Sequence, residues 1–313
     1  MIENKILKSH DLPLVSVPVI TYNSSAYIID GLESIKAQTY KNIELIISDD
    51  CSTDNTVEIC RQWLEKNKDR FARTLLITSD KNTGVAGNCN RSISFCQGEW
   101  IKGLSGDDRF LPHTIQRYVD FVLKHPEADI CAAKLKLFGE DQFLLADAER
   151  FYESICYTNL KKDLHHQQTT ILKTLFVPGP CLFYKKKLWS EIGGFDEKYQ
   201  FCEEYPFSLR VLYNENQIFF LNEELYGYHI RSNSLCREKK GLNYRVQRDL
   251  DNYTLDERIP LLLSKKKYFT AFDLYIDAKR RISTTDKSFS RHWYSILRLA
   301  SPLRYIRRIS GLL

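Results

Sequence analysis

Short apolar runs alternate with segments of helical periodicity through the first 125 residues of the chain. Between the runs, apolar residues recur on one helical face, as Ile28, Leu32 and Ile35 do. Strand and helix alternating with short connections predict an α/β fold with a doubly wound, mostly parallel sheet. The runs predicted as strands are Leu14–Tyr22, Ile43–Ile47, Thr74–Thr78 and Glu99–Leu104.

Polar and acidic residues stand at the end of each of these predicted strands. The carboxyl ends of parallel strands lie along one edge of a sheet, where open α/β proteins bind their ligands. We therefore expect a single acidic crevice there. Its residues are Thr21, Tyr22 and Asn23 after the first strand, Asp49 and Asp50 after the second, Asn82 and Gly84 after the third, and Asp107 and Asp108 after the fourth.

Two local features qualify this pattern. Pro18 removes a ladder donor from the first predicted strand, which predicts a bulge there. After Asp49 and Asp50, Ser52 and Thr53 offer an N-cap for the next helix, so a cap and a surface turn are the alternative explanation for these acids.

The pattern becomes less regular beyond Asp129. A second acidic pair, Glu203–Glu204, opens a predicted helix over Phe201–Tyr213, and acids at a helix start also favour the helix dipole. His165 and His166 have no carboxylate at metal-ligand spacing, so we do not expect a metal there. The strands expected in this part are Asp129–Gly139, Cys181–Tyr184 and two edge strands, Ile218–Leu221 and Leu225–Ile230.

The last quarter of the chain is mostly helical in pattern and basic. After Ser288 it contains five arginines and no acidic residue, while Leu303, Ile306 and Ile309 recur on one face of a predicted helix. A basic amphipathic helix of this kind is typical of a segment that lies on an anionic membrane surface. Packing on its own domain or on a partner is the alternative.

Composition narrows the class of protein. With 313 residues, 43% hydrophobic and 27% charged, the chain suits one large globular domain with an appendage. A net charge of +5 without a basic, aromatic-rich stripe in the first two thirds does not indicate a nucleic-acid partner. Nine cysteines without a C-x-x-C pair predict free thiols in a reducing cytosol. Without an apolar leader or a run of about 18 apolar residues, we expect a cytoplasmic protein, either soluble or attached to the inner membrane face.

The familiar nucleotide motifs are missing. No G-x-G-x-x-G follows the first strand, and no G-x-x-x-x-G-K-[ST] occurs. A nucleotidyltransferase would want a Gly- and Lys-rich loop after the first strand, which the segment TYNSSAY does not supply.

Residues 15–56 resemble the opening of the family 2 glycosyltransferases, which have the GT-A fold. The similarity continues through Asn82–Gly84, Asn90, Gly106–Asp108, GGFDE at 193–197, Glu203–Glu204 and YHIRSNS at 228–234. It implies an N-terminal tail (1–12) and a catalytic domain (13–238) made of a Rossmann-like nucleotide-binding half (13–110) and an acceptor-binding half (111–238). A helical C-terminal region (239–313) with the basic tail (288–313) follows.

The resemblance also implies residue roles. Thr21, Tyr22, Asn23, Asp49, Asn82, Gly84, Asn90 and Asp107 would bind the nucleotide-sugar, and Asp50 would read the base. Asp108 is implied as the more direct metal ligand, with Asp107 and His229 beside it, and Glu204 as the general base, with Glu203 as its competitor. Two departures are Ser105, where the family often has Asp, and Glu204, where the base is commonly Asp.

These roles suit one reaction, an inverting sugar transfer. Mn²⁺ or Mg²⁺ on hard carboxylate ligands stabilises the leaving diphosphate, and a carboxylate on the opposite side takes the acceptor proton. The implied donor is a nucleotide-sugar, most simply a UDP-sugar. The implied acceptor is a saccharide, lipid-linked in cell-surface polysaccharide or O-antigen assembly. The alternative is a catalytically silent protein of this family that holds nucleotide-sugar or membrane.

Overall fold

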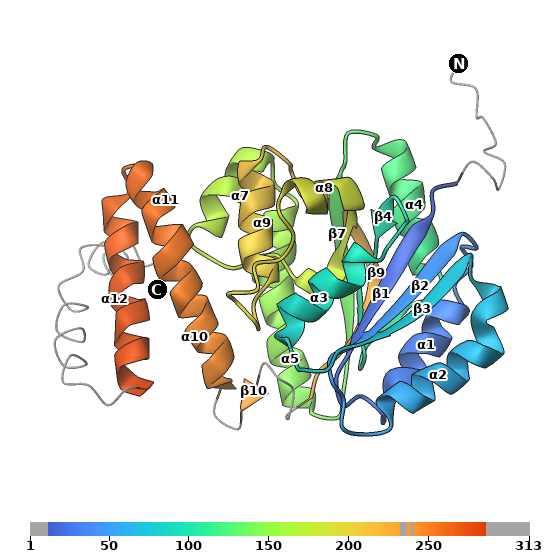
Figure 1. Ribbon diagram of the computed structural model, residues 1–313. Helices are drawn as coiled ribbons and strands as arrows, with labels where there is room; N and C mark the ends of the chain where they lie inside the picture. The colour runs from blue at the N-terminus through green and yellow to red at the C-terminus, as the bar shows by residue number, and fades with distance from the viewer. Residues whose placement is uncertain (1–11, 232–236, 239–240, 286–313) are drawn as a thin grey trace, which may run out of the picture.

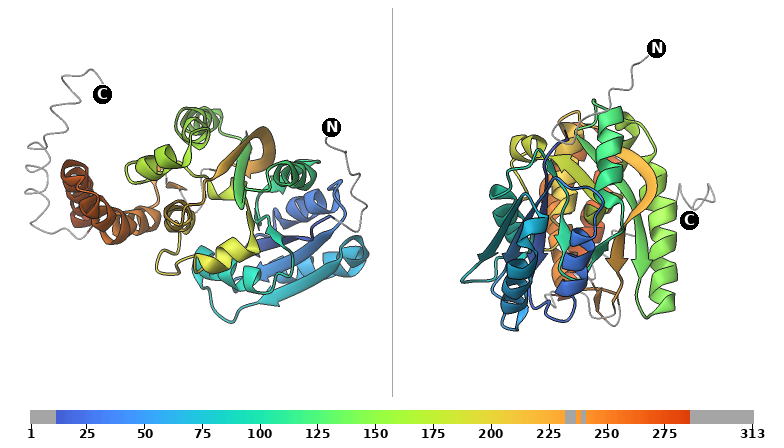
Figure 2. Two further views of the ribbon diagram at one scale, coloured as in Figure 1. Left: turned by 90° about the horizontal axis from the view of Figure 1, so that it is seen from above. Right: turned by 90° about the vertical axis from the view of Figure 1, so that its right-hand side faces the viewer.

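The computed structural model describes residues 12–231, 237–238 and 241–285. One mixed sheet runs through the molecule in the order β3-β2-β1-β4-β8-β7-β9-β6, with β5 also paired to β1. In Figure 1 the N-terminal strands lie at one end of the molecule and the C-terminal helices α10 to α12 at the other. Figure 2 shows the same arrangement from above and from the side. The basic tail expected at 288–313 lies outside the described residues.

The N-terminal half has the parallel, doubly wound arrangement that the apolar pattern predicts. Strands β1 (Val15–Thr21), β2 (Ile43–Asp49) and β3 (Arg73–Thr78) are parallel neighbours, and every residue of β2 is buried. The helices between and after them are α1 (Ile28–Lys36), α2 (Thr56–Asn67) and α3 (Gly84–Ser94). Buried Ile28, Leu32 and Ile35 confirm the predicted inner face of α1.

The bulge predicted at Pro18 is wrong. The register of β1 with β2 is unbroken, with Pro18 opposite Ile46. On its other side β1 pairs with two short strands, β4 (Trp100–Ile101) and β5 (Leu104–Ser105), instead of the single strand expected over Glu99–Leu104. The break between them falls beside Pro18, so the missing N–H is accommodated by interrupting the neighbouring strand.

The second half of the sheet is mixed. β7 (Ile130–Phe138) is antiparallel to β8 (Leu182–Lys185) and parallel to β9 (Phe219–His229), and β6 (Arg109–Phe110) closes the far side against β9. The two edge strands expected at 218–230 are wrong in number and position. They form one continuous inner strand, β9, whose register with β7 shifts near Lys134.

Helices surround this half and continue beyond it. α4 (Thr114–Lys124) packs near β9. α5 (Gln142–Phe151) passes directly into a π-helix (Tyr152–Tyr157). The elements that follow are α6 (Thr158–Leu160), α7 (Leu164–Ile171), α8 (Lys186–Glu191) and α9 (Glu204–Tyr213). Beyond the short pair β10 (Arg237–Glu238) and β11 (Gly241–Leu242) come α10 (Tyr244–Tyr253), a second π-helix (Thr254–Arg258), α11 (Ile259–Ser264) and α12 (Tyr268–Thr285).

One hydrophobic core joins the two halves. It extends from Val15 and Ile47 in the parallel strands through stacked Trp100 and Phe183 to Tyr253 of α10. The eight described cysteines are free thiols, as predicted for those positions. None of the helices in the described part of the chain has the length and apolar character needed to traverse a bilayer.

Candidate active site

The ends of β1 and β2 are locked together at the predicted edge. The backbone N–H of Asn23 donates to Ser52 Oγ (2.8 Å), and Asn23 Oδ1 accepts from the Thr53 N–H (2.8 Å). Asn23 and Cys51 both have positive φ, 49° and 68°, which non-glycine residues rarely adopt. Such conformations concentrate at functional sites, so this edge is held in a strained, pre-formed shape.

Asp50 is buried at this edge, and all of its carboxylate lone pairs are engaged. Oδ2 accepts from the N–H groups of Thr83 (2.8 Å) and Gly84 (2.9 Å), and Oδ1 accepts from Thr83 Oγ1 (2.7 Å) and Arg91 (2.8 Å). A carboxylate has about four acceptor sites. Asp50 therefore fixes the turn before α3, and a base N–H would have to displace one of these donors.

Asp49 serves the turn on its own strand. Its two oxygens accept from the N–H (2.8 Å) and the hydroxyl (2.5 Å) of Ser52.

The hydroxyl of Thr21 is buried at the end of β1 and, unlike the Asp49 carboxylate, has no partner within the described residues. A Cβ built on Gly106 would lie 3.1 Å from that hydroxyl. Gly106 thus lets its loop approach Ser24 and Thr21 closely, and the Thr21 hydroxyl is an unpaired buried polar atom of the kind that a bound ligand satisfies.

The two acids of the Gly106–Asp108 loop face different surroundings. Asp108 is buried, and its oxygens accept from Tyr226 Oη and the His229 N–H, both at 2.8 Å. Burial and the neighbouring Asp107 raise the pKa of Asp108 well above its usual range. The side chain of Asp107 is 26% exposed and forms an ion pair with Arg231. Asp107 is therefore the more accessible of the two acids, whereas the family resemblance implies Asp108 as the more direct metal ligand.

A buried lysine lies beneath this loop. Lys102 Nζ donates to the Pro180 carbonyl (2.6 Å) and lies 4.5 Å from the centre of the Tyr226 ring. Burial lowers its pKa to about 7, against the attraction of Asp108. Because Tyr226 bonds Asp108, Lys102 connects the acidic loop to the Val177–Pro180 turn.

The Glu203–Glu204 pair lies at the start of α9, as the sequence predicts. Within the described residues neither carboxylate forms an ion pair or a hydrogen bond with another side chain. Desolvation, with a contribution from Asp249 of α10, raises the pKa of Glu203 to about 7. Desolvation and the neighbouring Glu203 raise the pKa of Glu204 well above its usual range. Raised carboxyl pKa values with a desolvation cause are typical of candidate proton acceptors.

Glu204 opens into a cavity of about 530 Å³ between the second half of the sheet and the C-terminal helices. Gly179 lies against the Glu204 side chain, where a Cβ would come within 2.9 Å of Glu204 Cβ. His229 and Arg231 line the same cavity. Aromatic and apolar residues complete the lining, including Phe151, Tyr152, Tyr205 and Tyr228, with Val246, Leu250 and Arg258 from the C-terminal region.

The nucleotide edge and this cavity are connected. His229 lines the cavity, and its N–H bonds Asp108. On the other side, Cys89 of α3 has its pKa raised by burial and by the joint charges of Glu203, Glu204 and Asp50. The structure therefore brings the strand-end acids and the Glu203–Glu204 pair into one neighbourhood, although about a hundred residues separate Asp107 from Glu204.

The cavity wall includes both π-helices. Tyr152, Ile155 and Cys156 come from one, and Arg258 comes from the other. π-helical turns are uncommon and often occur at functional sites.

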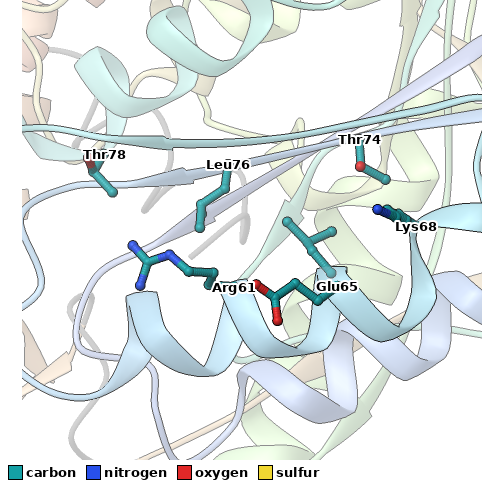
Figure 3. A pocket seen from close by; sticks show the side chains of 7 residues that line it. Arg61, Glu65, Lys68, Thr74, Leu76 and Thr78 are labelled. Atoms are coloured by element: carbon teal, nitrogen blue, oxygen red, sulfur yellow. The ribbon is translucent and has the colours of Figure 1, made fainter.

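A second hollow of about 360 Å³ lies between α2 and β3, lined by Arg61, Leu64, Glu65, Lys68, Thr74, Leu76 and Thr78 (Figure 3). It contains none of the strand-end acids.

Three other residues expected to bind ligands, Asn82, Asn90 and His229, have contacts within the protein. The Asn90 amide accepts from the Phe195 N–H (2.9 Å) and donates to the Phe195 carbonyl (2.8 Å) and Glu197 (3.0 Å), so it clamps the GGFDE turn. Asn82 is exposed and accepts from the Gly84 N–H (3.1 Å). The His229 ring is stacked on Phe138, with centroids 4.6 Å apart. Tyr22 remains free to meet a ligand, being 45% exposed.

Sequence reasoning missed three cations at this site: Arg91, Lys102 and Arg231. Each accompanies a buried or half-buried acid. A buried carboxylate requires a cation or several donors nearby, and this was the available signal. The need for a cation does not identify which of the 45 lysines and arginines of the chain supplies the charge.

Residues 16–193 match the family model described as Glycosyl transferase family 2, more than half of the chain. The chain belongs to this family. It is 28% identical over 239 residues to the glycosyltransferase GlyG of Streptococcus pneumoniae, covering 74% of this chain and 75% of the relative. It is 26% identical over 316 residues to the chondroitin synthase of Pasteurella multocida, but spans only 30% of that protein.

Solved glycosyltransferases share the fold. Residues 1–349 of Staphylococcus aureus TarS, solved with UDP-GlcNAc, superpose with a TM-score of 0.57 at 20% identity, covering 92% of this chain and 88% of that one. The mannosyltransferase PcManGT of Pyrobaculum calidifontis, solved with GDP-Man and Mn²⁺, gives 0.58 at 15% identity, covering 96% and 88%. The GT-A fold and the family 2 glycosyltransferase class expected from the sequence are therefore confirmed.

Proposed function

We propose that this family 2 enzyme transfers a sugar, with inversion, from a nucleoside diphosphate sugar to a saccharide hydroxyl. The observation that carries the proposal is the cavity that Glu204, unpaired and desolvated, shares with Arg231, whose guanidinium binds Asp107. A single displacement requires a proton acceptor for the incoming hydroxyl and positive charge beside the leaving diphosphate, and these side chains can supply both.

The bonds change in one step. The acceptor oxygen attacks the anomeric carbon, the bond from that carbon to the diphosphate oxygen breaks with its electron pair, and Glu204 takes the acceptor proton. Arg231 lies beside Asp107, at the wall where we place the developing negative charge. Glu203 raises the proton affinity of Glu204 by charge repulsion.

The donor occupies the β1–β2 edge in this proposal. Tyr22 presents an exposed ring for the base, and the Thr21 hydroxyl, which has no partner within the described residues, receives the ribose or diphosphate. Asp50 and Asp49 hold this edge in shape. Solved members of the fold hold a UDP-sugar and a GDP-sugar. A UDP-sugar, the donor expected from the sequence, is the first one to test.

A divalent metal fits this site through Asp107. The described residues contain no cluster of three or more metal-ligating side chains. Mg²⁺ and Mn²⁺ with nucleotides typically use one or two protein carboxylates, the remaining ligands being phosphate and water. Asp107 is accessible for that role, whereas both oxygens of Asp108 already accept hydrogen bonds. When bound, the metal would supply Lewis-acid stabilisation of the leaving diphosphate.

The acceptor and the cellular setting rest on relatives and on the tail sequence. Chondroitin synthase among the relatives, the aromatic cavity and the basic segment 288–313 support a saccharide acceptor, lipid-linked at an anionic membrane face, in surface polysaccharide assembly. The competing proposal is a silent nucleotide-sugar-binding protein, favoured by Ser105 in place of the family's usual acid.

Release of UDP from a panel of UDP-sugars, measured with and without Mn²⁺, tests the enzyme. We expect metal-dependent release that falls at least 100-fold in Asp107→Ala and in Glu204→Gln, with Glu204→Gln still binding UDP. Glu191→Gln, an exposed acid on α8, is the matched control and should leave release unchanged. UDP binding without turnover on any donor and acceptor would favour the silent protein.

A further inference from the structure

The outer side of α12 carries a stripe of exposed aromatic rings. Tyr268 and Phe269 are 60% and 59% exposed, and Phe272 and Tyr275 are also exposed. Positions 268, 272 and 275 lie on one helical face, because four and seven residues correspond to one and two turns. The buried positions Ala271, Ile276 and Ala278 face inward. Large rings exposed in a row on one helix mark an interaction surface.

Cations lie beside the aromatic stripe. Lys265, Lys266 and Lys267 are consecutive and exposed, directly before Tyr268, and Leu263 is exposed just ahead of them. Lys265 Nζ lies 4.8 Å from the centre of the Tyr213 ring. Farther along α12, Lys279 Nζ lies 5.8 Å from the centre of the Tyr275 ring. Leu263, Lys265–Phe269, Phe272, Tyr275 and Lys279 together form what we call the α12 face.

We propose that the α12 face docks on the surface of an anionic phospholipid bilayer. Tyrosine and phenylalanine rings favour the boundary between headgroups and acyl chains, and lysines are attracted to an anionic lipid surface. The described residues alone therefore carry the two elements of a peripheral membrane surface. The proposal extends the proposed function by naming the surface that brings the enzyme to a lipid-linked acceptor.

Charge favours a bilayer over the two other possible occupants of the α12 face, the C-terminal tail and a second copy of the chain. Residues 286–313 contain six lysines and arginines (287, 291, 298, 304, 307, 308) against one acid (286), a net charge of 6 − 1 = +5. A tail of that charge would be repelled by Lys265–Lys267, and so would the same face of a second copy. An anionic bilayer complements the lysines and the basic tail together.

The position of the face is compatible with docking. α12 forms the end of the molecule away from β1, β2 and β3 (Figure 1), so the nucleotide edge stays clear of the bilayer. α10 lies between, packing on α12 and lining the cavity with Val246 and Leu250. The cavity is thus nearer to the proposed membrane surface than the nucleotide edge is.

Co-sedimentation of the full chain with phosphatidylcholine vesicles, with and without phosphatidylserine, tests the proposal. We expect binding only when phosphatidylserine is present, decreasing with added salt. Phe269→Ser/Phe272→Ser and Lys265→Gln/Lys266→Gln/Lys267→Gln should each weaken it on the order of 10- to 100-fold. Phe143→Ser removes a ring that is 86% exposed on α5 and should change nothing.

A tail variant, Arg304→Gln/Arg307→Gln/Arg308→Gln, separates the two basic regions. Partial loss in this variant, with further loss when the α12 lysines are also changed, supports a shared surface. The proposal is overturned if the full chain does not bind, or if the α12 variants bind like the unchanged chain. It is also overturned if the aromatic changes only lower the melting temperature or the oligomeric state, as a covered face would. Because the assay needs no donor, its failure is distinguishable from absent sugar transfer.

Discussion

The molecule contains two groups of acids with opposite surroundings. At the nucleotide edge, Asp50 accepts four hydrogen bonds, one of them from Arg91. At the start of α9, Glu203 and Glu204 are desolvated and have no side-chain partner in the described part of the chain, and their pKa values are raised. Satisfied acids hold a shape, whereas unsatisfied acids retain proton affinity for chemistry. Substitution should therefore affect folding in opposite directions at the two places.

Asp50→Asn should have the largest effect on folding. The amide leaves the Arg91 guanidinium without its charge partner and sets an NH₂ group against existing donors. We expect a loss of about 3–5 kcal/mol in the free energy of unfolding, as for a broken buried pair. Urea denaturation measures it, with exposed Asp80→Asn as the control. A loss of less than about 1 kcal/mol would remove the structural role of Asp50.

Lys102→Met tests whether the buried lysine beneath the acidic loop is desolvated. Because burial lowers the Lys102 pKa to about 7, its contribution to stability is present above its unfolded pKa, near 10.5, and is lost as the pH falls to about 7. Unfolding free energy of the unchanged chain should rise by a few kcal/mol from pH 7 to 10 relative to Lys102→Met. Parallel stability curves for the two proteins would show that Lys102 is not desolvated.

Glu203→Gln should stabilise the fold, in contrast to Asp50→Asn. The Glu203 pKa is raised from 4.5 to about 7, so its contribution is present below pH 4.5 and is lost as the pH rises through 7. At pH 8 the variant should be more stable by about 1–3 kcal/mol, and at pH 4 the difference should vanish. A less stable variant at pH 8 would place Glu203 among the structural acids.

Asn90→Ala is the smallest change. Its amide clamps the turn at Phe195 and Glu197, so we expect a loss of about 1 kcal/mol in stability. UDP affinity, measured by calorimetry, should stay within about threefold, which is under 1 kcal/mol. A larger loss of UDP affinity would show that Asn90 contacts the nucleotide, as the family resemblance implies.

The sequence was most informative about the regular half of the molecule. Apolar runs such as Ile43–Ile47 are buried on both faces and lead straight to polar strand ends, so pattern alone located β1, β2, β3 and their acids. It was less informative where long-range contacts decide the structure. The break between β4 and β5 depends on Pro18 in a neighbouring strand, and β9 is continuous because β7 and β6 flank it.

The site shows the same division. The acids could be named from the sequence, but not their partners, since Arg91, Lys102 and Arg231 lie far from those acids along the chain or carry no pattern. Asp108 is less accessible than Asp107 because Tyr226 and the His229 N–H, both from β9, engage its two oxygens. That contact lies more than a hundred residues away along the chain and has no sequence pattern. The contribution of α10 and the second π-helix to the cavity had no sequence signal.

We propose that Glu204 takes the proton of the acceptor hydroxyl, whereas the nucleotide edge only holds the donor. The most direct test is the turnover number of Glu204→Gln at saturating donor and acceptor, measured at pH 8 alongside its UDP affinity. We expect the turnover number to fall about 10²- to 10⁴-fold while the affinity for UDP is kept. Turnover within about threefold of the unchanged enzyme, under 1 kcal/mol in activation free energy, would contradict it.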